Sequence, residues 1–342
     1  MSNDVDILIV GAGHGGLGVA ARLKARDRSV LIVDENARVG DVWRRRWASL
    51  RLFSPRFANT LPGMPFPNGA DPFPGKDEVA DYQERYAHEL CVQMRLATRV
   101  RRITPRGDSF EVSIDGAVIR ARNAIVTTGA HYTPRIPDFA SRLDPAIRQL
   151  HSSAYGAAGA LPPGPVLIVG GRNSGAEIAM DLARDHDVTL TYASGTRHAP
   201  RRWRSPRWWR LAQFRSWVLR GAILPAPLPW PLRPPHGRWI DVDVERAQRE
   251  GLLRLAPRAI DAVAGVVRFA DGTELRPRTV VWSTGFRIDD SWIDVPLDAK
   301  GMRIGRHRRG PVPGLWANRA NLLGSLHWGA LDIAADLERL GR

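Results

Sequence analysis

A glycine-rich turn near the N-terminus constrains the fold of this chain more than any other feature. It reads Gly-Ala-Gly-His-Gly-Gly over residues 11–16 and directly follows a short apolar stretch, residues 5–10. A helical pattern comes next, over about residues 14–26, and a second apolar stretch over 29–33 ends at Asp34. Strand, turn, helix and strand in this order predict a β-α-β unit of a doubly wound α/β fold.

Each residue type in this turn has a physical reason. Gly11 permits the sharp turn, Gly13 leaves room for a diphosphate to approach the backbone, and Gly16 lets the helix pack closely on the strand. The helix N-terminus offers unpaired N–H groups and a positive dipole end to the phosphates. Asp34 can accept hydrogen bonds from ribose hydroxyls and repels a 2′-phosphate. The alternative, a glycine turn without a ligand, is disfavoured by the complete context.

The same pattern restarts in the middle of the chain, with a second glycine-rich turn over residues 170–175. A helical pattern and another apolar stretch follow, over residues 176–184 and 187–192. Each unit is later followed by an apolar stretch that ends in Thr-Gly, over residues 124–129 and 279–285. The chain is therefore predicted to hold two nucleotide-type units.

The stretch after Asp34 carries a family resemblance. Residues 39–44, Val-Gly-Asp-Val-Trp-Arg, together with the runs over 43–55 and 61–67, resemble the bacterial branch of flavin-containing monooxygenase-like proteins. Asp41 stands where many relatives have a second glycine. Further marks of the family are Phe139, His151 to Tyr155, Ser283 to Phe286 and Ser291 to Ile293, so the resemblance spans nearly the whole chain.

The resemblance implies two Rossmann-like, three-layer FAD/NAD(P)-binding domains, the second inserted in the first. Residues 1–155 plus 275–342 are expected to form a discontinuous FAD domain. Residues 160–270 are expected to form the NAD(P)H domain, with a Trp/Arg-rich lid at about 200–240.

The same resemblance implies FAD as the cofactor of the first unit, and it places Trp43 and Arg44 beside the flavin and its phosphates. The full set of expected FAD residues is Gly11, Gly13, Gly15, Gly16, Asp34, Glu35, Trp43, Arg44, Leu52, Val100, Thr128, Gly129 and Ser325.

For the second unit, the resemblance implies NADPH. Arg172 stands where the fingerprint has its middle glycine, so this side chain either blocks the nucleotide or grips its phosphates. No acid ends the strand that follows, and arginines come after it, which favours NADPH over NADH. The expected NADPH residues are Gly170, Arg172, Asn173, Ser174, Gly175, Ser194, Arg197, Thr284 and Gly285.

The activity implied is that of a monooxygenase. NADPH reduces the flavin, O₂ forms a flavin C4a-hydroperoxide, and one oxygen atom passes to nitrogen, sulfur or a carbonyl carbon of a small organic substrate. Two alternatives stay open: a flavin oxidase or dehydrogenase that ignores NADPH, and a degraded, FAD-stabilised partner subunit. A disulfide reductase needs a cysteine pair, and the chain has one cysteine, Cys91. No metal site is expected.

Catalytic side chains are harder to name. Phe53 is expected at the flavin face, and His327 is a candidate acid–base group, although a lone histidine is more often structural. Trp208 and Trp209 are candidate substrate contacts within a segment rich in Trp and Arg. We favour a lid for this segment over a membrane-surface anchor or a nucleic-acid site.

Composition sets the remaining expectations. The net charge of +15 comes mainly from arginine and suits anionic ligands. No apolar stretch approaches the ~18–20 residues that a spanning helix needs. We therefore expect a cytoplasmic enzyme whose partners are a small molecule and O₂; the sequence leaves the oligomeric state open, and a homodimer is compatible with it.

Overall fold

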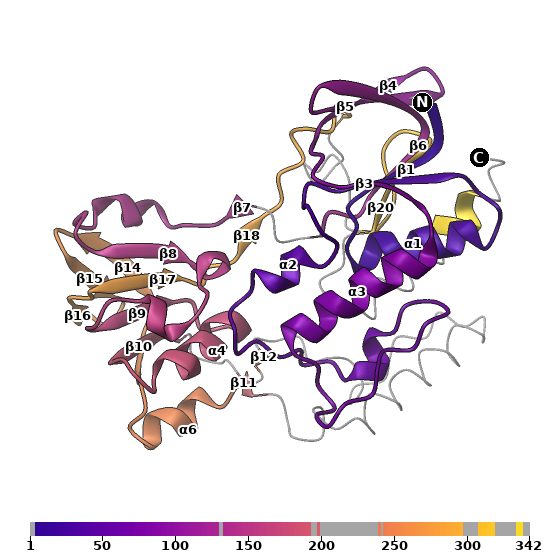
Figure 1. Cartoon of the computed structure of the whole chain (residues 1–342). Helices are drawn as coiled ribbons and strands as arrows, with labels where there is room; N and C mark the ends of the chain where they lie inside the picture. The colour runs from indigo at the N-terminus through magenta and orange to yellow at the C-terminus, as the bar shows by residue number, and fades with distance from the viewer. Residues whose placement is uncertain are drawn as a thin grey trace, which may run out of the picture. The chain divides into compact units, whose positions relative to one another are not determined.

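The computed structural model describes residues 4–129, 133–192, 197–198, 239–240, 242–296, 307–318 and 333–337. The chain divides into two compact units (Figure 1). The first unit comprises residues 1–44, 56–133 and 286–342, and the second comprises residues 45–55 and 134–285.

The first unit is built on one mixed sheet whose strand order is β19-β20-β6-β1-β2-β3, with β4 and β5 continuing from β6 as antiparallel neighbours. Its central strands are parallel and apolar on both faces, and Ile7, Leu8 and Ile9 of β1 are fully buried. The strands are β1 (Asp4–Val10), β2 (Val30–Val33), β3 (Gln93–Arg95), β4 (Val100–Arg106), β5 (Ser109–Ile114), β6 (Ala117–Val126), β19 (His307–Arg309) and β20 (Leu315–Asn318).

Helices α1 (His14–Lys24) and α3 (Lys76–Leu90) pack against each other, and α1 also contacts β1 and β2. The helix α3 forms because Val79, Tyr82 and Tyr86 recur on one face, and all three are buried. The short α2 (Asp41–Arg44) and the 3₁₀ turn η1 (Arg56–Asn59) lie before α3 in the chain.

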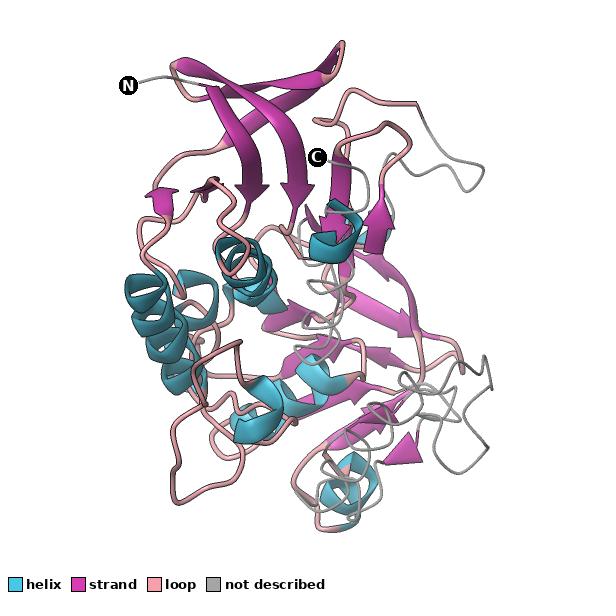
Figure 2. Ribbon diagram, turned by 90° about the vertical axis from the view of Figure 1, so that its right-hand side faces the viewer, coloured by secondary structure: helices cyan, strands magenta, loops and turns pink. Residues whose placement is uncertain are grey.

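The second unit has a five-stranded parallel sheet in the order β13-β10-β9-β17-β8. Figure 2 distinguishes its strands from its helices by colour. The sheet strands are β8 (Arg148–His151), β9 (Val166–Val169), β10 (Val188–Thr191), β13 (Arg254–Ala256) and β17 (Thr279–Trp282); the helices are α4 (Asn173–Leu182) and α6 (Val244–Arg249).

A small antiparallel sheet also belongs to the second unit: β14 (Ala259–Val263), β15 (Val266–Phe269) and β16 (Glu274–Leu275). It shares a buried cluster with Leu167 of β9 and with Trp282 of β17. The remaining short elements are β7 (Thr133–Pro134), η2 (Asp138–Arg142), η3 (Ser152–Ala154), η4 (Ala158–Ala160), β11 (Arg197–His198), β12 (Trp239–Ile240) and β18 (Phe286–Arg287).

The predicted fold class, α/β with two nucleotide-type units, is confirmed. The division differs from the expected boundaries in three places. The strands β8 and β17, expected in the first domain, both lie in the second unit's sheet, where β17 pairs with β8 and β9. Residues 45–55 also belong to the second unit. Trp47 is buried in that unit's core, and Leu50 packs against the same cluster.

Candidate nucleotide-binding sites

The first glycine turn has the geometry that its sequence predicts. Gly11 has a φ of +111°, a conformation that side chains disfavour, and its N–H donates to Val33 O over 2.8 Å. A Cβ on Gly16 would lie 1.9 Å from Gly11 O and 2.8 Å from Thr127 Oγ1. The close approach of α1 to the turn therefore requires glycine at position 16.

Gly13 differs, because a Cβ there would meet no atom within 4 Å. The protein's own packing does not require a glycine at this position. Gly13 is the N-cap of the 11-residue α1, makes no side-chain cap, and has no acidic residue in the turn after it. The open space beside the N–H groups of a helix N-terminus suits a phosphate.

Asp34 follows β2 and is held against the turn. Its Oδ2 accepts from Ala12 N over 2.6 Å, and its Oδ1 accepts from the backbone N and the side-chain Nδ2 of Asn36 over 2.8 and 2.7 Å. A carboxylate offers about four acceptor positions. These three bonds orient the group and leave capacity for a ribose hydroxyl.

Thr128 and Gly129 follow β6 at the same edge of the sheet. The preceding Thr127 hydroxyl lies 2.9 Å from both Val10 O and Gly11 O, which joins the end of β6 to the turn. Thr128 Oγ1 is buried and has no hydrogen-bond partner in the part of the chain that the structure describes. An orphaned buried hydroxyl next to the glycine turn is what a bound ligand would satisfy.

Arg44 makes ion pairs within the first unit. Its guanidinium contacts Glu84 at 2.7 Å, Asp81 at 3.0 Å and Asp41 at 3.4 Å, and it donates to Val39 O over 2.8 Å. These contacts engage Nη1 and Nη2, so Arg44 ties α2 to α3, and its place beside the flavin phosphates stays a prediction.

The other expected FAD residues stay predictions. Glu35 lies 3.6 Å from Arg99 and is largely exposed, Val100 begins β4, and Trp43 lies half-buried in α2. Leu52 is buried and Phe53 is exposed, and both belong to the second unit. Residues Ser194, Trp208, Trp209, Ser325 and His327 lie outside the described residues, as does most of the expected lid.

The second turn repeats the backbone of the first. Gly170 has a φ of +112°, and a Cβ on Gly175 would lie 1.9 Å from Gly170 O, matching the clash at Gly16. Gly285 has a φ of +84° after β17, close to the +79° of Gly129 after β6. The predicted duplication therefore extends to individual backbone angles.

Arg172 is the N-cap of α4 and the counterpart of Gly13. Its side chain is exposed, and no hydrogen bond or ion pair joins it to another described residue. Asn173 and Ser174, the next two residues, begin α4. The arginine therefore stands at a helix N-terminus of the kind that binds phosphates, with its donors uncommitted.

Tyr192, which sequence reasoning missed, takes the position of the ribose-binding acid. The Tyr192 hydroxyl donates to Glu245 Oε1 over 3.2 Å. A Cβ on Gly171 would lie 3.1 Å from Tyr192 Cδ2, so the turn rests against the tyrosine ring. Only the strand register reveals this placement, because no motif marks it.

His151 ends β8 and is fixed in one orientation. Its Nδ1 accepts from Ser153 N over 3.2 Å, so Nε2 carries the proton and donates to Gly285 O over 3.0 Å. Burial lowers the pKa of His151, and the positive charge of Arg46 lowers it further, while the bond to Gly285 raises it. The histidine is thus held neutral beside the Thr284-Gly285 turn, where the Thr284 hydroxyl donates to Arg135 O.

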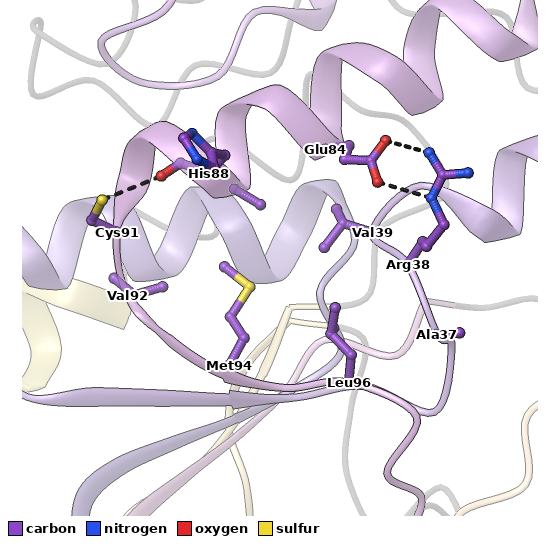
Figure 3. A pocket seen from close by; sticks show the side chains of 10 residues that line it. Ala37, Arg38, Val39, Glu84, His88, Cys91, Val92, Met94 and Leu96 are labelled. Carbon is purple, nitrogen blue, oxygen red and sulfur yellow. Dashed lines mark hydrogen bonds and ion pairs between the residues drawn. The ribbon is translucent and has the colours of Figure 1, made fainter.

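A separate cavity of about 540 Å³ lies in the first unit, between the end of α3 and β3 (Figure 3). Figure 3 shows the Arg38–Glu84 ion pair on one side and Cys91 on the other, its Sγ directed to His88 O at 3.3 Å. None of the expected cofactor residues lines this cavity.

Comparison with known proteins identifies the family to which the chain belongs. Residues 8–213 match the model of a family described as pyridine nucleotide-disulphide oxidoreductase. A relative from Geobacillus kaustophilus (strain HTA426), an uncharacterized CzcO-like oxidoreductase, is 34% identical over 322 residues, which cover 92% of this chain and 91% of the relative. Indole-3-pyruvate monooxygenase YUCCA1 of Oryza sativa subsp. japonica is 29% identical, covering 96% of this chain and 88% of that protein.

Among solved structures, a flavin-containing monooxygenase from Stenotrophomonas maltophilia superposes with a TM-score of 0.80 at 25% identity, and the match covers 100% of both chains. No helix within the described residues is both long and apolar enough to cross a membrane.

Proposed function

Because this chain belongs to the pyridine nucleotide-disulphide oxidoreductase family, and within it to the flavin-containing monooxygenase-like proteins, we propose that it is an FAD monooxygenase that NADPH reduces. The membership confirms the resemblance carried by the residues after Asp34 and makes the chain a flavin-dependent oxidoreductase. The proposal adds the nucleotide, the cofactor residues and the substrate class.

The first glycine turn carries the proposal. An open Gly13, an oriented Asp34 carboxylate and the orphaned Thr128 hydroxyl meet at one sheet edge, as a dinucleotide diphosphate and ribose require. We assign FAD to this site. When bound, FAD supplies the electron transfer and the activation of O₂, while the protein binds it, orients it and excludes water.

The second unit is assigned to NADPH. The N-terminus of the 10-residue α4 supplies N–H groups for the diphosphate, and Arg172 adds a cation next to them. Tyr192 in place of an acid removes the charge that would repel a 2′-phosphate. The domain boundaries and the insertion of this unit in the first remain part of the proposal.

A flavin oxidase that ignores NADPH is the second candidate, and Arg172 favours it, since a side chain replaces the bare backbone at the diphosphate position. Disulfide reduction lacks support, because the single thiol of Cys91 has no intramolecular partner.

The substrate is proposed as a small organic molecule oxygenated at nitrogen, sulfur or a carbonyl carbon. The test is anaerobic mixing of the FAD-loaded protein with NADPH, followed by measurement of NADPH-dependent O₂ consumption with an amine, a sulfide and a ketone. Bleaching of the flavin and substrate-dependent oxygenated product support the proposal. A flavin that stays yellow with NADPH but is bleached by an organic donor supports the oxidase.

A further inference from the structure

Arg46 belongs to a segment that is anchored firmly in the second unit. The next residue, Trp47, is buried in the unit's core together with Tyr155. Ala48 N donates to Gly156 O over 2.8 Å, which fixes the backbone beside the residues that follow β8. The two residues that follow Arg46 therefore fix its position in the second unit.

Among the described residues of the second unit, none compensates the charge of Arg46. The side chain is half-buried, and no hydrogen bond or ion pair joins it to any residue that the structure describes. Burial lowers the pKa of the Arg46 guanidinium. The positive charge of Arg46 in turn lowers the pKa of His151, so this histidine offers Arg46 no negative charge. A guanidinium withdrawn from water without an anion is unfavourable.

Two other arginines of the described residues, Arg56 and Arg44, are desolvated and paired with carboxylates. Arg56, whose side chain is 10% exposed, lies 2.6 Å from Glu78 Oε1. Arg44, 19% exposed, has its three carboxylates. Arg46 departs from this pattern, and the departure points to an anion that is supplied from outside the chain.

The position of Arg46 relative to the strands of the second sheet indicates where such an anion would bind. The strands β9, β17 and β8 run parallel and in register, so Val169, Trp282 and His151 end at one edge. His151 is bonded to Gly285 O at that edge, and the Gly170 turn lies against Ser283. Ligands of open α/β sheets bind outside the carboxyl ends of the strands. Trp47 packs with Tyr155 and Ala48 N bonds to Gly156 O, so the Arg46 segment runs beside the residues that follow β8 at this edge, and the charge of Arg46 lowers the pKa of His151.

We propose that Arg46 binds the diphosphate of the pyridine nucleotide in the second unit, opposite the α4 N-terminus and Arg172. The inference rests on the proposed use of NADPH. A guanidinium fork matches phosphate oxygens with two parallel hydrogen bonds. The nicotinamide is a poorer partner, because it is neutral when reduced and cationic when oxidised. The diphosphate is the anion shared by NADPH and NADP⁺.

The test uses the FAD-loaded full chain and compares Arg46→Met with Arg184→Met. Arg184 is an exposed arginine beyond the C-terminus of α4, at the opposite edge of the sheet, and its substitution removes the same charge. Titration calorimetry with NADP⁺ is expected to give a Kd raised about tenfold or more in Arg46→Met and unchanged in Arg184→Met. The dependence of Kd on salt should weaken only in Arg46→Met.

A second readout separates ligand binding from a structural role. Removal of an uncompensated half-buried charge should leave the thermal midpoint of Arg46→Met unchanged or higher, with full FAD content. An equal Kd for NADP⁺ in Arg46→Met and wild type overturns the inference while leaving the proposed function intact. A wild type that binds neither NADP⁺ nor NADPH overturns both.

If Arg46→Met does not fold, wild-type protein gives the answer. Arginine-specific labelling with phenylglyoxal, located by mass spectrometry, is expected to modify Arg46 and to be suppressed there by saturating NADP⁺, while labelling of Arg184 continues. Equal labelling of Arg46 with and without NADP⁺ contradicts the inference.

Discussion

Tyr192 occupies in the second unit the position that Asp34 occupies in the first. Each residue follows the second strand of its β-α-β unit, and each donates its backbone N–H to the neighbouring parallel strand, Asp34 to Arg95 O at 3.0 Å and Tyr192 to Ala256 O at 2.8 Å. The first unit thus has a carboxylate at this position of the sheet edge, and the second unit has an aromatic ring.

Exchanging this one residue should change the nucleotide preference. In Tyr192→Asp, a carboxylate would face the 2′-phosphate, so the Kd for NADPH should rise about tenfold relative to that for NADH. Tyr192→Phe is the matched control, because it removes the hydroxyl that bonds to Glu245 and keeps the ring. Stopped-flow flavin reduction with both nucleotides measures the ratio, and an unchanged ratio in Tyr192→Asp would show that this edge does not face the ribose.

The two glycines of the first turn should respond differently to alanine. Gly16→Ala places a Cβ 1.9 Å from a backbone oxygen, so this variant should be strongly destabilised with or without FAD. Gly13→Ala meets no protein atom, so the apoprotein should keep its thermal midpoint while FAD affinity falls at least about tenfold. Full FAD occupancy in Gly13→Ala would show that this turn does not contact FAD.

Loss of the Asp34 carboxylate should release FAD. Asp34→Ala removes the expected ribose acceptor and leaves the N–H groups of Ala12 and Asn36 without their partner, so FAD should be lost on gel filtration. Asp108→Ala removes an exposed carboxylate in the turn between β4 and β5, away from the expected FAD residues, and should retain FAD. The ratio of flavin absorbance to protein absorbance is the measurement, and equal ratios in the two variants would refute the assignment.

Arg44→Met tests the structural role of that arginine. The variant leaves Asp41 and Asp81 without their cation and leaves Glu84 with Arg38 alone, so the free energy of unfolding should fall by about 1–3 kcal/mol. Denaturant unfolding of the apoprotein measures this loss. A variant with wild-type stability and weakened FAD binding would instead place Arg44 at the flavin phosphates, as the family resemblance implies.

His151 should make stability depend on pH. Burial lowers the pKa of His151 in the folded protein below its ordinary value of about 6.5, so the neutral form favours folding. This contribution is fully present above pH ~6.5 and is lost as the pH falls through the folded-state pKa. Urea unfolding between pH 8 and 5 should show a steeper loss in wild type than in His151→Gln. An equal pH dependence of the unfolding free energy in the two proteins would show that another group causes the loss of stability at low pH.

Local sequence was sufficient for the parts of this protein whose geometry is local. The turns at Gly11 and Gly170 could be predicted because a positive φ, a helix start and a tight strand–helix contact each demand glycine at a set spacing. The second Thr-Gly pair, at Thr284-Gly285, followed from the same repetition. These features involve neighbours within a few residues of one another.

Contacts between residues far apart in the chain decide the side-chain partners and the sheet to which each strand belongs. The family resemblance places Arg44 beside the flavin phosphates, and only the fold reveals that Asp81 and Glu84 of α3 lie at its guanidinium. Strand pairing, not position in the chain, assigns β8 and β17 to the second sheet.

Tyr192 and Arg46, which the sequence analysis did not name, also depend on long-range contacts. Tyr192 stands at the ribose edge because of strand register, and Arg46 lies half-buried without an anion because Trp47 anchors it. A sequence pattern records which side chains are present and how far apart they are along the chain. Whether a charge meets a carboxylate, water or open space depends on segments tens to hundreds of residues away, and that pairing exists only once the chain is folded.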